Sequence, residues 1–102
     1  MQSVNKLLKG LNVLYAEDDD VIKANTSKTL KLFCNDVYEA DNGADALELF
    51  HQKDVNIVIL DYVMPLLDGY NVAKEIRKID KNIPIFITSS YTEKEKLLSM
   101  IG

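Results

Sequence analysis

The sequence has little of several things that would mark other protein classes. Its 102 residues include one cysteine, Cys34, so no disulfide can form within the chain, and a lone thiol fits a reducing compartment. Twelve basic residues against sixteen acidic ones give a net charge of -4, which disfavours a nucleic-acid surface. No apolar stretch reaches signal-peptide or membrane-spanning length. We therefore expect a cytoplasmic protein that contacts neither membranes nor nucleic acid, with Cys34 as a small core residue.

Two kinds of ligand-binding motif are also absent. No glycine-rich phosphate loop or G-x-G-x-x-G motif follows the first apolar run, which argues against a nucleotide-binding domain. His51 is the only histidine, so no histidine and cysteine cluster can hold a softer metal such as zinc, and we expect His51 on the surface.

Short apolar runs alternate with segments of helical periodicity along the whole chain. The runs predict strands, and the last of the periodic segments opens on Thr92-Glu93-Lys94-Glu95, which has the form of a capping box. Right-handed crossovers between such units produce a parallel sheet with helices on both faces, so the fold class is α/β. One domain is expected over residues 1–102. The predicted strands are 11–16, 37–40, 55–60 and 83–87, and the predicted helices are 21–33, 44–52, 69–79 and 92–102.

Polar side chains stand where these strands end. Glu17 and Asp18 follow the first strand, Asp61 follows the third and Ser89 follows the fourth. Open α/β sheets bind ligands at the carboxyl ends of their strands, so these residues are expected to gather at one edge. Carboxylates brought together repel one another unless a cation neutralises them, and oxygen ligands suit Mg²⁺. The sequence therefore predicts a magnesium site there.

A carboxylate beside a divalent ion can attack phosphorus in line, which would make Asp61 a nucleophile. The Ser89 hydroxyl could then bind a phosphoryl oxygen and move when phosphate arrives. Asp19 and Asp20 are each interpreted instead as an N-cap or first-turn residue of the following helix, and Asn42-Gly43 as a turn. Asp68 is a further helix cap. The alternative for Asp61, a capped loop with no chemistry, does not explain acidic strand ends at two separate places.

The chain resembles the receiver domain of two-component response regulators, through V-L-Y-A-E-D-D, V-I-L-D-Y-V-M-P-L-L-D-G-Y and P-I-F-I-T-S-S-Y in that order. The resemblance covers essentially the whole chain. It implies a doubly wound, flavodoxin-like sheet of order 2-1-3-4-5 and Mg²⁺-dependent transfer of a phosphoryl group to an aspartate. The implied donors are a sensor histidine kinase or a phosphotransfer protein, and a downstream effector protein would read the result.

The resemblance also assigns roles to single residues. Asp61 matches the phospho-acceptor, Glu17 and Asp18 match the metal-binding acidic pair, and the backbone carbonyl of Val63 would complete the metal shell. Ser89 matches the switch hydroxyl, with Thr88 as the alternative if the fourth strand ends one residue earlier. Such a domain accepts phosphate without being an enzyme in the usual sense.

The largest departure from the family is an absence. Family members continue with a fifth strand ending in Lys-Pro and a fifth helix, whereas this sequence stops at Gly102 with four units, so we expect a truncated receiver without an output domain. No phosphate-pairing lysine can be assigned, because Lys94 and Lys96 fall on the predicted fourth helix. An apolar fourth strand at the edge of the sheet would favour dimers or strand-swapped oligomers.

Two other functions compete with the receiver. A magnesium-dependent phosphatase of the haloacid dehalogenase type also uses an aspartyl nucleophile, but it requires Asp-x-Asp where this chain has Asp61-Tyr62-Val63. The second is a receiver-like interaction module that is never phosphorylated. Such a module differs from a phosphorylated receiver domain in activity and not in fold.

Overall fold

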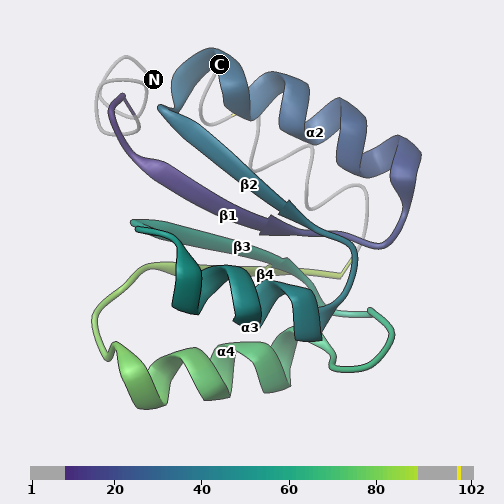
Figure 1. The fold of residues 1–102 in the computed structure, drawn as a ribbon. Coiled ribbons are helices and arrows are strands. Elements are labelled where there is room, and N and C mark those ends of the chain that lie inside the picture. The colour runs from purple at the N-terminus through teal and green to yellow at the C-terminus, as the bar shows by residue number, and fades with distance from the viewer. Residues whose placement is uncertain (1–8, 90–98, 100–102) are drawn as a thin grey trace.

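The sheet and helices alternate along the chain as the sequence predicts. The computed structural model describes residues 9–89 and 99 (Figure 1). Four parallel strands form one sheet in the order β2-β1-β3-β4, which confirms the α/β class and the predicted strand order. The predicted fourth helix lies outside the described residues except for Ser99, which is helical. The elements are β1 (Asn12–Ala16), α2 (Asp20–Phe33), β2 (Asp36–Ala40), α3 (Gly43–Gln52), β3 (Ile57–Asp61), α4 (Gly69–Ile79) and β4 (Ile85–Thr88).

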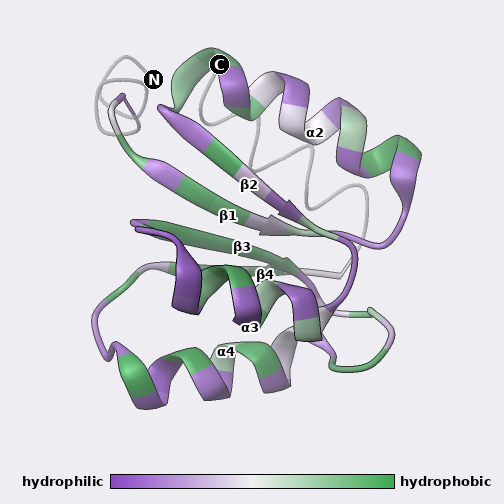
Figure 2. Cartoon of the chain, viewed as in Figure 1, coloured by the Kyte–Doolittle hydropathy of each residue, from purple (hydrophilic) through white to green (hydrophobic). Residues whose placement is uncertain are grey.

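The two faces of the sheet are covered unequally. In Figure 1, α2 lies on one face, and α3 and α4 lie together on the other. Successive strand residues point to opposite faces, so β1 sends Leu14 into the larger core cluster beneath α3 and α4 and sends Val13 and Tyr15 into the smaller cluster beneath α2. Figure 2 shows long hydrophobic stretches in the two central strands and mixed colours along the helices. This pattern is typical of strands buried on both faces.

Each helix begins at a polar cap. Asp19, Asn42 and Asp68 accept hydrogen bonds from backbone N–H groups three residues on, at 3.0, 2.8 and 2.8 Å respectively. The predicted caps at Asp19 and Asp68 are confirmed. The predicted turn at Asn42-Gly43 is wrong, because Asn42 caps α3 and Gly43 is its first residue. A side-chain acceptor at Asn42 competes successfully with the turn that the dipeptide favours.

All four strands differ from the predicted ranges, β1 and β2 by one residue at the start and β3 and β4 at both ends. β3 begins at Ile57 and includes Asp61, and its pairing with β1 runs from Val13–Ile57 to Ala16–Leu60. β4 begins at Ile85 and not at residue 83, because Pro84 has no N–H to donate and contributes its carbonyl to Val58 N–H at 3.0 Å. Apolar continuity alone does not mark where pairing starts.

The surface agrees with several simpler expectations. Phe86 and Ile87 of β4 are 41% and 40% exposed, and among the described residues this strand pairs with β3. His51 is exposed, and Cys34 is half-buried against the smaller core cluster, where burial raises the pKa of its thiol. Within residues 9–89, no helix combines the length and apolar character needed to cross a bilayer.

Candidate functional site

Three carboxylates meet at the carboxyl ends of the two central strands. Glu17 directly follows β1, and Asp61 is the last residue of β3. The pairing of Ala16 with Leu60 brings these two residues to the same level of neighbouring strands. One oxygen each from Glu17, Asp18 and Asp61 lies within 4.8 Å of the others. The structure therefore brings together the three acidic residues that the sequence predicted, and we call them the acidic cluster.

Burial and backbone bonds hold the cluster in place. Glu17 is 1% exposed and Asp61 is 7% exposed, whereas Asp18 is exposed to solvent. The Glu17 N–H donates to the Ala40 carbonyl at 3.0 Å, and a Glu17 carboxylate oxygen accepts from the Asp19 N–H at 3.2 Å. Two buried carboxylates beside a third create a strongly negative site, which favours binding of a cation.

The donor set fits a hard divalent cation. Mg²⁺ prefers hard oxygen ligands and is usually bound through one or two carboxylates together with waters and phosphate oxygens. Carboxylate oxygens that lie within 4.8 Å of one another supply such a donor set. No nitrogen or sulfur ligand belongs to this cluster, and softer metals prefer such ligands. The acidic cluster thus fits Mg²⁺.

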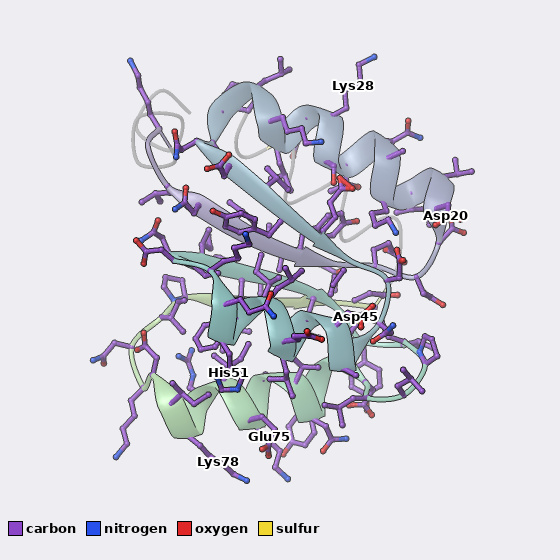
Figure 3. The ribbon with its side chains drawn as sticks, viewed as in Figure 1. Asp20, Lys28, Asp45, His51, Glu75 and Lys78 are labelled. Atoms are coloured by element: carbon purple, nitrogen blue, oxygen red, sulfur yellow. The ribbon has the colours of Figure 1, made fainter. Side chains whose placement is uncertain are left out.

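The neighbouring acidic residues have structural partners instead. Asp19 caps α2, and Asp20 forms an ion pair with Lys23 at 3.4 Å. Lys23, whose side chain is 13% exposed, also pairs with Asp41 in the loop after β2. Figure 3 labels Asp20 and Asp45, which lie in the first turns of α2 and α3 at the edge where the strands end. Acidic residues there also interact favourably with the positive ends of the helix dipoles.

A tight loop joins Asp61 to α4 and carries Val63. Tyr62 and Val63 are exposed, while Met64 is buried in the larger core cluster. At the loop's end, the Gly69 N–H donates to the Tyr62 carbonyl at 2.9 Å. A Cβ at Gly69 would lie 2.4 Å from the Asp61 carbonyl oxygen, so only glycine fits against the strand end. The sequence predicted Asp68 as a helix cap but gave no indication of this contact.

The two candidate switch hydroxyls have different surroundings. Thr88 is the last residue of β4, pairs with Asp61 across the sheet and is buried, with its hydroxyl 3.5 Å from the Leu60 carbonyl. Ser89 follows directly after the strand and is exposed. The Tyr62 N–H donates to the Thr88 carbonyl at 2.8 Å, which ties the end of β4 to the loop after Asp61.

Tyr15 is a buried neighbour that the sequence analysis did not single out. It is fully buried on β1, two residues before Glu17 and facing α2. Burial raises the pKa of its phenol well above the ordinary value, and the negative charges of Glu17, Asp61 and Glu39 add to the effect. The nearby Thr26 hydroxyl opposes the shift, although no hydrogen bond of good geometry reaches the phenol from the described residues. Nothing in the local sequence distinguishes Tyr15 from other tyrosines in core strands, so the sequence did not indicate its position near the acidic cluster.

Comparisons with known proteins agree on one family. The family model for the response regulator receiver domain matches residues 13–101. A probable transcriptional regulator, ycf27, from Galdieria sulphuraria is 36% identical over 85% of this chain, and the sensor kinase CckA of Brucella abortus is 32% identical over 91%. The chain spans 34% and 10% of the lengths of these two proteins.

A solved structure supports the same assignment. The receiver domain of the Francisella response regulator 1452 is 29% identical and has a TM-score of 0.73, covering 91% of this chain and 78% of that one. The chain therefore belongs to the response regulator receiver domains of two-component signalling.

Proposed function

We propose that Asp61 accepts a phosphoryl group from a phosphohistidine on a sensor histidine kinase or phosphotransfer protein. The observation that carries the proposal is the acidic cluster, in which buried Asp61 ends β3 within reach of Glu17 and Asp18. A carboxylate oxygen of Asp61 attacks phosphorus, the P–N bond to the histidine breaks, and the departing imidazole takes up a proton from solvent. The product is an acyl phosphate on Asp61, and a downstream effector protein reads it.

Mg²⁺ is the proposed cofactor. Glu17, Asp18 and Asp61 would hold it through carboxylate oxygens, and Val63 through its backbone carbonyl. When bound, the ion neutralises charge on the phosphoryl oxygens. Glu17 contributes a fixed position, since its backbone and carboxylate are both hydrogen-bonded. The exposed Asp18 leaves the cluster open on the solvent side, where a donor can approach.

Ser89 is the proposed switch residue. It stands at the end of β4, the strand next to β3, and its exposure permits a change of hydroxyl orientation on phosphorylation. The Thr88 alternative is less favourable, because its hydroxyl is buried close to the Leu60 carbonyl. The end of β4 also bonds the loop after Asp61, so a movement there would reach both strands. In this role the chain accepts phosphate and does not turn over a substrate.

Intact-mass measurement tests the proposal. The protein is incubated with Mg²⁺ and acetyl phosphate, or with a phosphorylated histidine kinase, beside an Asp61→Asn variant. We expect one phosphoryl adduct on the wild-type protein and none on the variant, because an amide cannot form the acyl phosphate. An adduct that persists in Asp61→Asn contradicts the assignment. Absence of any adduct with both donors favours the unphosphorylated interaction module, and steady turnover of a small phosphorylated substrate favours the phosphatase.

A further inference from the structure

The loop after Asp61 has a strained tip. The Leu67 N–H donates to the Pro65 carbonyl at 2.8 Å, and the residue between them, Leu66, has φ of 72°. A three-residue turn with a positive φ at its centre is the rare form of γ-turn, which residues other than glycine adopt reluctantly. Leu66 is 79% exposed, so packing of its own side chain does not hold the turn. Contacts made by other residues must therefore hold the turn in this conformation.

Gly43 lies directly against this turn. A Cβ built on Gly43 would lie 1.9 Å from the Leu67 carbonyl oxygen and 2.7 Å from the Leu67 carbonyl carbon. Gly43 is buried at the start of α3, and its neighbour here is backbone, which cannot rotate away as a side chain can. Glycine is required at this position for space and not for an unusual backbone angle. The first turn of α3 and the tip of the loop therefore fit together only because Gly43 has no side chain.

The contact links two loops at the same edge of the sheet. α3 begins just after β2, and the loop that contains Leu67 begins at Asp61. Gly69 packs against Asp61 and Tyr62 at the start of that loop, and Gly43 packs against Leu67 near its tip. Along the chain, Val63 lies between these two points of contact. A shift of Leu67 would move the segment that is proposed to offer the Val63 carbonyl to the metal.

We propose that Gly43 is a positioning residue for the phosphorylation site. By seating the Leu67 carbonyl it holds the Leu66 turn, and through the turn it keeps residues 62–67 in the conformation that completes the metal site beside Asp61. This inference rests on the proposed function. A side chain at position 43 displaces the turn and weakens Mg²⁺ binding, although Gly43 itself touches neither metal nor phosphate.

Gly43→Ala and Asn42→Ala form a matched pair of variants. Both lie at the start of α3, but Asn42→Ala removes only side-chain hydrogen bonds with Asp45, the helix cap among them, and leaves the contact with Leu67 intact. Mg²⁺ affinity is measured by calorimetric titration well below the unfolding temperature. We expect at least a fivefold weaker Mg²⁺ affinity and a similarly slower phosphoryl uptake for Gly43→Ala, and a change within twofold for Asn42→Ala. Equal losses in both variants, or none in Gly43→Ala, would overturn the proposal.

A second pair of variants keeps the test decisive if Gly43→Ala does not fold. Leu66→Ile places a β-branched residue at position 66, and β-branched residues strongly disfavour a positive φ. Leu66→Asn is the control, because asparagine adopts a positive φ more readily. The position is exposed, so both should fold. We expect Mg²⁺ affinity to fall in Leu66→Ile and to stay within twofold in Leu66→Asn. Unchanged affinity in Leu66→Ile overturns the inference. If wild-type protein takes up no phosphate, the proposed function fails, while the Mg²⁺ titrations still judge Gly43.

Discussion

The two ends of the sheet use polar residues in opposite ways. At the end where the strands begin, the Asn12 side chain donates to the Asp54 carbonyl at 2.8 Å and accepts from the Asn35 side chain at 2.9 Å, and Asn56 accepts from the Asn12 N–H at 2.8 Å. At the end where the strands finish, Glu17, Asp18 and Asp61 crowd together. Amides both donate and accept, so they satisfy one another, whereas carboxylates only accept and repel.

Because of this difference, the polar residues at one end stabilise the fold, whereas those at the other end are candidates for function. The asparagine network at the first end closes three segments with ordinary hydrogen bonds, and such bonds stabilise the fold. The carboxylates of the acidic cluster at the other end repel one another, and a bound cation would offset that repulsion. Residues that destabilise a fold yet persist in a buried site are functional candidates. Substitutions at the two ends should therefore have opposite effects on stability and on metal binding.

The largest effect is expected at the acidic cluster. Asp18→Asn removes one anionic ligand, and we expect the Mg²⁺ dissociation constant to rise on the order of 10- to 100-fold. Without Mg²⁺ the variant should unfold at the same temperature as wild type or higher, because the repulsion is reduced. Thermal unfolding with and without Mg²⁺ measures both effects. Asp20→Asn, which lies outside the cluster, is the control, and an equal loss of affinity there would remove the distinction.

A smaller effect is expected at the opposite end. Asn12→Ala deletes two side-chain hydrogen bonds, and we expect it to lower the free energy of unfolding by about 1–2 kcal/mol. Mg²⁺ affinity and phosphoryl uptake should not change, since the acidic cluster lies at the other end of β1. Chemical denaturation and magnesium titration give the two readouts. A weakened metal site in Asn12→Ala would show that the ends are coupled.

The smallest effect concerns Tyr15, which lies in the sheet between the two ends. Below pH 10 its phenol is neutral in both the folded and unfolded chain, so its titration does not affect stability. Above its ordinary pKa of 10.0 the unfolded chain ionises while burial keeps the folded phenol neutral, so stability falls as pH rises. We expect a loss of up to about 1.4 kcal/mol per pH unit from this residue.

Tyr15→Phe provides the test of that pH dependence. The variant should lose stability less steeply than wild type between pH 10 and 11, because one titrating group has been removed. Denaturation midpoints measured at several alkaline pH values give the two slopes. Identical slopes would show that the phenol ionises in the folded protein as easily as in the unfolded chain.

Much of the fold and of the acidic cluster follows from local sequence signals. Apolar runs that end in acids predicted both the strands and the place where Glu17 and Asp61 meet, because parallel strands end at a common edge. The caps at Asp19 and Asp68 were predictable because a side-chain acceptor needs only its own helix. The switch assignment to Ser89 stays a prediction, as do the metal role of Val63 and the phosphorylation of Asp61.

Contacts between segments far apart in the sequence were not predictable in the same way. Asn42-Gly43 has the form of a turn, yet Gly43 is in a helix and meets a loop more than twenty residues later in the chain. The positive φ of Leu66 has no local cause, since leucine does not favour it. Both features depend on how α3 and the loop after β3 pack together.

The sequence by itself determined the order of the strands and helices, the caps of α2 and α4 and the gathering of three carboxylates at one edge. These follow from periodicity, from short-range hydrogen bonding and from the geometry of parallel sheets. The tertiary structure decided how deeply each carboxylate is buried, how Tyr15 is enclosed and how Gly43 holds the loop beside Asp61. Those properties depend on distances between separate elements, and such distances are set only when the core packs.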